Sequence, residues 1–321
     1  MAEIVTIGEP LVLFASEDED QSLAQATHFH KYLAGAEVNV AVGATRLGHS
    51  VDYLTAVGAG PNGEFITQAL ASRGIETDHI AVDSAHWTGV MFKQKTSVGD
   101  PATFYMRQDS AAANLTAAQL PALDLTATRF AHLTGIYAGV SATSRQTLKA
   151  LITRLHQANV PISFDPNLRP ALWPDEAVMR QTLNRLAQEA TLVLPGLKEG
   201  RTLTGAQTPA AIAQFYFDQS SRTQVVVIKL GSRGAYFQTR EGAHGTVPGF
   251  VADRVVDTVG AGDGFALGVL TGRLEGLDWA AATERGNAIG ALGVQSPSDN
   301  DGYPDQAGLT QFIKTATRAV V

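Results

Sequence analysis

The sequence of 321 residues contains no cysteine. A chain without thiols forms no disulfides, zinc–thiolate sites or iron–sulfur clusters, and it has no cysteine nucleophile. It also lacks any run of 18 apolar residues, so we expect no membrane-spanning helix. Charged residues make up only 17% of the chain, against about 25% in typical soluble domains. Stability must come from a core, and a chain of this length buries about three quarters of its extended surface.

Positive charge is in deficit. The chain has 24 Lys and Arg against 31 Asp and Glu, a formal net charge of −7, and no block of basic residues. This balance argues against nucleic acid as a partner. The first ten residues, M-A-E-I-V-T-I-G-E-P, lack the basic segment that opens a signal peptide, so we expect a cytoplasmic protein. An acidic chain that binds an anion has to do so through local donors.

The chain is rich in glycine, with 31 residues, and alternates short apolar runs with longer segments of helical periodicity. Several runs are apolar throughout, such as V-V-V-I at 225–228, which is typical of strands buried on both faces. The alternation predicts an α/β protein with a mostly parallel sheet. The predicted strands are 4–7, 51–57, 130–133, 161–164, 192–194, 225–230 and 235–237. The predicted helices are 37–47, 63–73, 144–158, 175–190, 209–220, 262–272, 279–294 and 305–316.

Two segments, 11–33 and 88–107, do not fit this alternation. They have the pattern of extended chain, as in G-V-M-F-K-Q-K-T and A-T-F-Y-M-R. Both are too long for ordinary loops, and long insertions in compact α/β proteins are often functional lids. We predict a small β-sheet that projects from the carboxyl edge of the main sheet, where ligands bind in such folds.

Two glycine-rich loops are candidates for binding phosphate. The first, G-A-G-P-N-G at 58–63, matches the dinucleotide pattern G-x-G-x-x-G, with Asp78 and Asp83 about 20 residues further on. It would favour an NAD-dependent oxidoreductase. However, it lies on the second strand and does not open a new βαβ unit, and the acidic residues follow a further turn. The alternative is a tight strand-to-helix turn.

The second loop, D-T-V-G-A-G-D at 257–263, precedes a helix-compatible segment. Gly260, Ala261 and Gly262 are small, and their N–H groups lie at the predicted helix start, where the helix dipole favours an anion. Asp263 follows these donors directly. Its carboxylate is well placed to accept a proton from an alcohol beside a phosphate. The alternative is an ordinary first-turn acid that complements the dipole.

The D-T-V-G-A-G-D motif, together with A-G-A-E-V-N-V-A-V-G-A-T-R-L-G at 34–48, resembles the two motifs of the PfkB (ribokinase-like) carbohydrate kinases. The resemblance covers essentially the whole chain. It implies a single domain at 1–321 with a ribokinase-like, three-layer α/β/α fold, a mostly parallel central sheet and the small β-sheet lid. It also implies phosphoryl transfer from ATP with Mg²⁺, with Asp263 as the base and residues 260–262 as the anion hole.

The resemblance further implies contacts with the nucleotide. The segment K-L-G-S-R-G at 229–234 is similar to one that lies along the nucleotide in this family; alone, it would be an ordinary hairpin turn. For Asn287, a capping or solvent-facing role is the alternative. The implied nucleotide contacts are Asn167, Lys229, Gly231, Ser232, Gly234, Gly260, Gly262 and Asn287.

Metal contacts are implied in the same way. Glu199 stands at the acidic position of the family's N-x-x-E motif, which is linked to Mg²⁺, but the asparagine position is Gly196. Asp257 and Thr258 would contribute to a site for a monovalent cation, K⁺, and a structural turn is the alternative.

On the substrate side, the chain most resembles the 2-keto-3-deoxygluconate kinases of the family. Tyr105 and Arg107 lie on the predicted lid, and Arg169 follows a predicted strand in F-D-P-N-L-R-P-A-L-W. The planar guanidinium of arginine can donate two parallel hydrogen bonds to the carboxylate of a sugar acid. The alternative is that both arginines are solvated surface residues. Met91 stands where these kinases often have Tyr. The implied substrate contacts are Gly35, Asn39, Met91, Tyr105, Arg107, Arg169, Asp263 and Asp299.

The predicted function is therefore phosphorylation of the primary hydroxyl O6 of 2-keto-3-deoxygluconate. The alternatives are a fructokinase or another sugar kinase of the family, a non-catalytic sugar sensor, and an NAD-dependent oxidoreductase. The lid strands have exposed edges that a second subunit would cover, which predicts a homo-oligomer formed through the lid. No nucleic acid and no membrane is expected as a partner.

Overall fold

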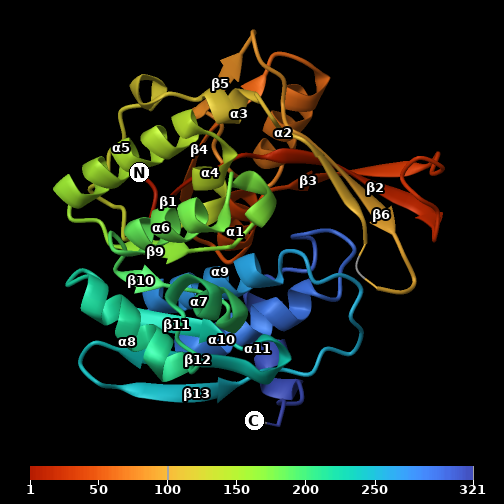
Figure 1. Ribbon diagram of the computed structural model, residues 1–321. Coiled ribbons are helices and arrows are strands. Elements are labelled where there is room, and N and C mark those ends of the chain that lie inside the picture. Colours follow the sequence, from red (N-terminus) through yellow and green to blue (C-terminus); the bar gives the residue numbers. More distant parts are fainter. Residues whose placement is uncertain (100, 321) are drawn as a thin grey trace.

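A nine-stranded sheet runs through the computed structural model, which describes residues 1–99 and 101–320 (Figure 1). Its order is β13-β12-β11-β10-β9-β8-β1-β4-β5. The pairs from β11 to β5 are parallel, and β12 and β13 add an antiparallel edge. The strands are β1 (Ile4–Ile7), β4 (Val51–Gly58), β5 (Ile80–Asp83), β8 (Phe130–Thr134), β9 (Ile162–Asp165), β10 (Leu192–Val193), β11 (Val225–Lys229), β12 (Gly234–Thr239) and β13 (His244–Pro248).

Helices cover both faces of this sheet, as predicted. In β11, Val226 and Ile228 pack into the core on one face, and Val225 and Val227 pack into the core on the other, which explains the continuous apolar run. The first face carries α3 (Ala111–Asn114), α4 (Gly135–Val140), α5 (Ala142–Gln157), α6 (Glu176–Ala187), α7 (Leu197–Thr204) and α8 (Pro209–Gln219). The second carries α1 (Ala36–Arg46), α2 (Pro61–Ala71), α9 (Ala261–Leu274), α10 (Trp279–Gly293) and α11 (Gln306–Thr315). The three-layer α/β/α prediction is confirmed.

Several short elements were not predicted: β5, β13, α3, α4 and α7. The strand β13, H-G-T-V-P, lies at the sheet edge and is half-exposed, so it lacks the apolar pattern of the central strands. The helices α3 and α4 have only four and six residues, too few for a helical period to show. No helix in the described part of the chain is long and apolar enough to cross a membrane.

A second sheet, ordered β3-β2-β6-β7, projects from the main body as a ribbon in Figure 1. Its strands are β2 (Leu11–Glu19), β3 (Phe29–Ala34), β6 (Val90–Lys95) and β7 (Thr103–Met106), which fall in the two segments predicted to be extended. Position 100 of the segment 88–107 lies outside the described residues. One face of this lid buries Leu11, Leu13, Ala34 and Met91. The prediction of a small lid sheet is confirmed.

The first glycine loop, at 58–63, is the turn between β4 and α2. A Cβ on Gly63 would lie 2.0 Å from the carbonyl oxygen of Gly58, so the turn has no room for a side chain there. The carboxylate of Asp83 accepts the backbone N–H of Ala85 at 2.7 Å and pairs with the ring of His86 at 2.8 Å. The glycines thus have a structural cause, and Asp83, one of the two acids in the expected position, already has local partners. The structure favours the tight turn.

The chain leaves β1 for β4 on one side and returns to β8 on the other, so the direction of sheet growth reverses at β1. Ligands bind at such switch points, beyond the carboxyl ends of parallel strands. Here those ends carry Glu9 after β1, Thr134 at the end of β8, Asp165 at the end of β9 and Lys229 at the end of β11. The lid strands start from the same edge, because β2 follows β1 after three residues.

Candidate active site

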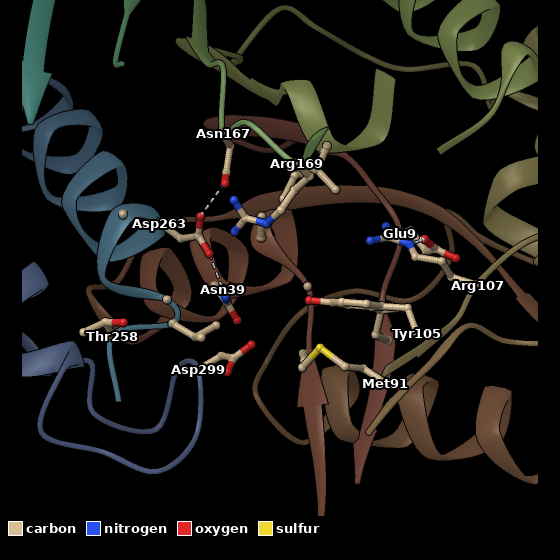
Figure 2. A pocket seen from close by; sticks show the side chains of 18 of the residues that line it. Glu9, Asn39, Met91, Tyr105, Arg107, Asn167, Arg169, Thr258, Asp263 and Asp299 are labelled. Atoms are coloured by element: carbon tan, nitrogen blue, oxygen red, sulfur yellow. Dashed lines mark hydrogen bonds and ion pairs between the residues drawn. The ribbon is translucent and has the colours of Figure 1, made fainter. Parts of the chain in front are cut away.

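A cavity of about 380 Å³ lies between the lid and the carboxyl edge of the main sheet (Figure 2). It is lined by all the substrate residues predicted from the sequence. Its wall also includes Asn167, Glu199, Lys229, Thr258, Gly260 and Gly262. The other predicted site residues, Gly231, Ser232, Gly234, Asp257, Ala261 and Asn287, are not in its wall.

Asp263 lies in the first turn of α9, and its side chain is buried. The Nδ2 of Asn39, on α1, donates to Oδ2 at 2.8 Å, and the Nδ2 of Asn167, beyond β9, donates to Oδ1 at 3.1 Å (Figure 2). The Oδ1 of Asn39 in turn accepts the Nδ2 of Asn300 at 2.8 Å. The carboxylate is therefore held from two sides by amides from distant parts of the chain.

Burial raises the pKa of Asp263 to about 7. The hydrogen bond from Asn39 opposes this shift, the negative charge of Asp165 adds to it, and the positive charges of Arg169 and Lys229 oppose it. A carboxyl group that exchanges its proton near neutral pH is suited to accept a proton from a substrate hydroxyl.

The start of α9 depends on Gly260. Its φ is +84°, and a Cβ there would lie 2.0 Å from the carbonyl oxygen of Asp299. The hydroxyl of Tyr303 donates to the carbonyl oxygen of Gly260 at 2.5 Å, so the loop at 299–303 packs directly on the helix start. Gly260 and Gly262 face the cavity. The first-turn amides of α9 therefore lie beside the Asp263 carboxylate, where an anion would complement them.

A buried ion pair not predicted from the sequence lies beneath the cavity. The Nζ of Lys229 is 2.6 Å from the Oδ2 of Asp165. Burial raises the pKa of Asp165 to about 6, and the charge of Lys229 opposes the shift. The motif F-D-P-N at 164–167, where a buried strand ends, could have indicated Asp165. The pair holds Lys229 at the cavity wall.

Glu199 caps α7 and supports the neighbouring loop. Its Oε2 accepts the backbone N–H of Gly196 at 2.6 Å, and its Oε1 accepts that of Leu168 at 2.7 Å. Leu168 lies between Asn167 and Arg169, so Glu199 fixes the segment that carries both of them. The carboxylate faces the cavity as well.

Asp299 is buried in the cavity wall, and its Oδ1 has no hydrogen-bond partner among the described residues. Burial raises the pKa of this carboxyl, and the charges of Lys93 and Arg169 oppose the shift. Because buried polar atoms rarely stay unpaired, an orphaned oxygen beside a cavity is suited to a ligand hydroxyl.

The two predicted arginines differ in their surroundings. Arg107, from the lid, pairs with Glu9: its Nε and Nη2 are 2.7 and 2.5 Å from Oε2, and Ser110 donates to Oε1. Glu9 was not predicted from the sequence as a site residue. Arg169 donates to the carbonyl oxygen of Leu168 at 2.9 Å, and within the described chain it forms no ion pair. Its guanidinium points toward Asp263 in Figure 2.

The Glu9–Arg107 pair gives a test of this part of the structure. The side chains are 1% and 11% exposed, so Glu9→Gln leaves a nearly buried guanidinium without its partner charge. We expect a loss of about 3 kcal/mol in the free energy of unfolding, measured by denaturant titration. The control is Glu19→Gln, which breaks a half-exposed lid pair with Lys95 and should cost at most about 1 kcal/mol. Equal losses would contradict the assignment.

Other predicted contacts lie outside the cavity. Gly231 and Ser232 form an exposed turn after β11. The Nδ2 of Asn287 donates to the carbonyl oxygens of Val247 and Pro248 at 3.1 and 3.0 Å, which ties α10 to β13. Its amide therefore has main-chain partners, and contact with the nucleotide stays a prediction for all three residues.

Residues 1–306 match the pfkB family of carbohydrate kinases. The chain belongs to this family. The kinase is 43% identical to the 2-dehydro-3-deoxygluconokinase of Bacillus subtilis (strain 168) over 319 residues, which cover 99% of this chain and 97% of the relative. It is similar in structure to a putative ribokinase II from E. coli in complex with ATP and Mg²⁺, with a TM-score of 0.90, 25% identity and coverage of 98% and 99% of the two chains. A fructokinase double mutant from Vibrio cholerae O395, with fructose, ADP and potassium ion bound, has a TM-score of 0.84, 26% identity and coverage of 98% of each chain.

Proposed function

We propose that this carbohydrate kinase transfers the γ-phosphoryl group of ATP to O6 of 2-keto-3-deoxygluconate. One observation carries the proposal: the buried Asp263 carboxylate, with its pKa raised to about 7, lies beside the first-turn amides of α9 in a cavity that also holds Arg169 and Asp299. The cavity thus combines a base, the start of a helix suited to an anion, and Arg169, a cation that forms no ion pair within the described chain.

The reaction assigned to the chain is a direct, one-step transfer of the phosphoryl group from ATP to the sugar. O6 attacks the γ-phosphorus in line while its proton passes to Asp263, the bond from phosphorus to the bridging oxygen breaks, and ADP leaves. The backbone N–H groups at the start of α9 stabilise the charge on the transferring group, because first-turn donors of a helix have no partner within the helix. The lid over the cavity excludes water, which limits hydrolysis of ATP.

ATP and Mg²⁺ fit the residues at the cavity. The start of α9 supplies positive potential for phosphate, and the wall also contains Lys229, which is paired with Asp165, and the carboxylate of Glu199. Magnesium usually keeps several waters and needs few protein ligands, so Glu199 would hold it through water. When bound, the ion compensates charge on the phosphates. An ATP complex of the related ribokinase II supports the choice of nucleotide.

A sugar acid is favoured over a neutral sugar by the charges in the cavity. Glu9 neutralises Arg107. Arg169 forms no ion pair among the described residues, although its charge acts on Asp263 and Asp299, and we assign it to the carboxylate of the substrate. The unpaired Oδ1 of Asp299 is suited to a sugar hydroxyl. The 43% identity with a 2-dehydro-3-deoxygluconokinase supports the same substrate.

Arg169→Ala should weaken binding of the sugar acid selectively. Loss of a charged hydrogen-bonded contact costs about 1.5–3 kcal/mol, so the KM for 2-keto-3-deoxygluconate should rise roughly 10–100-fold while the KM for ATP changes little. Steady-state kinetics with each substrate varied in turn measures both constants. Arg180→Ala, on the exposed face of α6, is the control. An unchanged KM for the sugar acid would contradict this role of Arg169.

A screen of acceptors by coupled ADP release tests the proposed function. We expect the highest kcat/KM with 2-keto-3-deoxygluconate, lower values with other sugar acids and the lowest with fructose. A preference for fructose would favour the fructokinase alternative. No turnover with any sugar would favour a sensor, and thermal stabilisation by NAD but not by ATP would favour the oxidoreductase.

A homo-oligomer formed through the lid stays part of this proposal. The edge strand β7 carries Phe104 and Met106, which are 58% and 54% exposed. Phe92, on β6, stacks on Phe14 of β2 and meets Phe29 of β3 edge-on. An apolar edge of this kind is suited to contact with a second copy of the chain.

A further inference from the structure

A buried ion pair connects the lid to the loop that precedes α9. The Nζ of Lys93, on β6, contacts the Oδ2 of Asp257, and the two side chains are 7% and 9% exposed. Lys93 lies two residues from Met91 on the same face of β6, the face turned toward the active-site cavity. The lid thus brings a positive charge to the first residue of the D-T-V-G-A-G-D motif.

Asp257 also binds the backbone directly before the proposed anion site. Its Oδ1 accepts the backbone N–H of Val259 at 3.1 Å, directly before Gly260. Its own N–H donates to the carbonyl oxygen of Val294 at 3.2 Å. The carboxylate therefore uses one oxygen to shape the loop and the other to bind the ammonium. A cation on that second oxygen stabilises the geometry of the amides at the start of α9.

The family resemblance assigns Asp257 and Thr258 to a monovalent cation, and the related fructokinase has a potassium ion bound. The residues of this chain do not fit such an ion. The Oδ2 of Asp257 already binds the Lys93 ammonium, and a second cation on the same buried carboxylate would be repelled.

We propose that the Lys93 ammonium takes the place of a monovalent metal ion at Asp257 and makes this kinase independent of K⁺. Lys93 acts as a positioning residue: it touches neither substrate nor phosphate and works through Asp257 and Val259. The inference rests on the kinase activity of the family and not on which sugar is the acceptor. Any sugar that the enzyme phosphorylates can serve in the test.

The test compares wild type with Lys93→Met in buffers where KCl replaces choline chloride at constant ionic strength. Wild type should show the same kcat and the same melting temperature in both salts. Lys93→Met in choline should lose roughly 10-fold or more in kcat, as expected for loss of a charged contact, and K⁺ or ammonium ion should restore much of it. A cavity of about 860 Å³ borders both Lys93 and Asp257, so small cations can reach the vacated position.

The melting temperature supplies a readout independent of turnover. K⁺ bound at Asp257 should raise the melting temperature of Lys93→Met but not that of wild type. Lys95→Met is the control, because Lys95 lies on β6 like Lys93 but forms a half-exposed pair with Glu19 of β2. This variant should behave as wild type in both salts.

Three results would overturn the proposal. The first is activation of wild type by K⁺, which needs no variant and holds even if Lys93→Met fails to fold. The second is a folded Lys93→Met with unchanged activity in choline. The third is a folded, impaired Lys93→Met that neither K⁺ nor ammonium ion restores. Absence of turnover with every sugar would instead count against the proposed function, and the wild-type melting temperatures would still test the cation site.

Discussion

Asp263→Asn should lower kcat by about 10²- to 10⁴-fold, because the amide cannot accept the hydroxyl proton that the carboxylate takes in the transition state. ATP binding should change little, since the amides of residues 260–262 and Lys229 remain. Stopped-flow or quench-flow measurement of single turnovers, with nucleotide binding by calorimetry, separates the two effects. Near-wild-type turnover would contradict the assignment of Asp263 as the base.

The pH dependence of the wild type provides a second readout for the same residue. With a raised pKa of about 7, the Asp263 carboxyl holds its proton below that pH and loses the ability to act as a base. The kcat/KM for the sugar should therefore fall as the pH drops below about 7. The residual activity of Asp263→Asn should not show this decrease at low pH. Asp278→Asn, the same change at the start of α10, keeps a good N-cap and should leave both rate and profile unchanged.

Gly260→Ala should be nearly as damaging, for a steric reason. A Cβ at this position would lie 2.0 Å from the carbonyl oxygen of Asp299, and the backbone has a φ of +84° that side chains disfavour. The start of α9 must shift, and displaced amides no longer meet the transferring phosphoryl group. We expect kcat to fall roughly 100- to 1000-fold, the loss typical of a missing oxyanion donor.

Gly276→Ala is the matched control for this substitution. Gly276 has the same φ of +84°, but a Cβ there meets nothing within 4 Å. It should lose about 1 kcal/mol of stability from backbone strain and keep the kinetics of the wild type. Equal kinetic losses in the two variants would show that strain alone, and not the position of the α9 amides, explains the effect of Gly260→Ala.

The parts of this molecule that were predictable from the sequence are those with a local cause. The run at 225–228 is buried on both faces of a parallel sheet, so its apolar composition alone indicated a central strand. The proposed anion site is similarly local, because glycines, helix start and acid are consecutive in 260–263. The lid was visible as alternation in two long segments.

Partners far apart in the sequence were not predictable. Glu9 and Arg107 are 98 positions apart, and Lys93 and Asp257 are 164 apart; no pattern within either segment indicates which charge it meets. Asn39 and Asn167 were each expected at the site, but their shared contact with Asp263 depends on how α1 and the loop after β9 pack. Short edge elements such as β13 were missed because half-exposed strands lose the apolar signal.

The most direct test of the central claim is ³¹P NMR of the product formed from ATP and 2-keto-3-deoxygluconate. We predict one new phosphomonoester whose phosphorus couples to the two protons on C6, formed in equal amount to ADP by the wild type and at least roughly 100-fold more slowly by Asp263→Asn. Release of inorganic phosphate in place of an ester, or an ester at another carbon, would contradict the account.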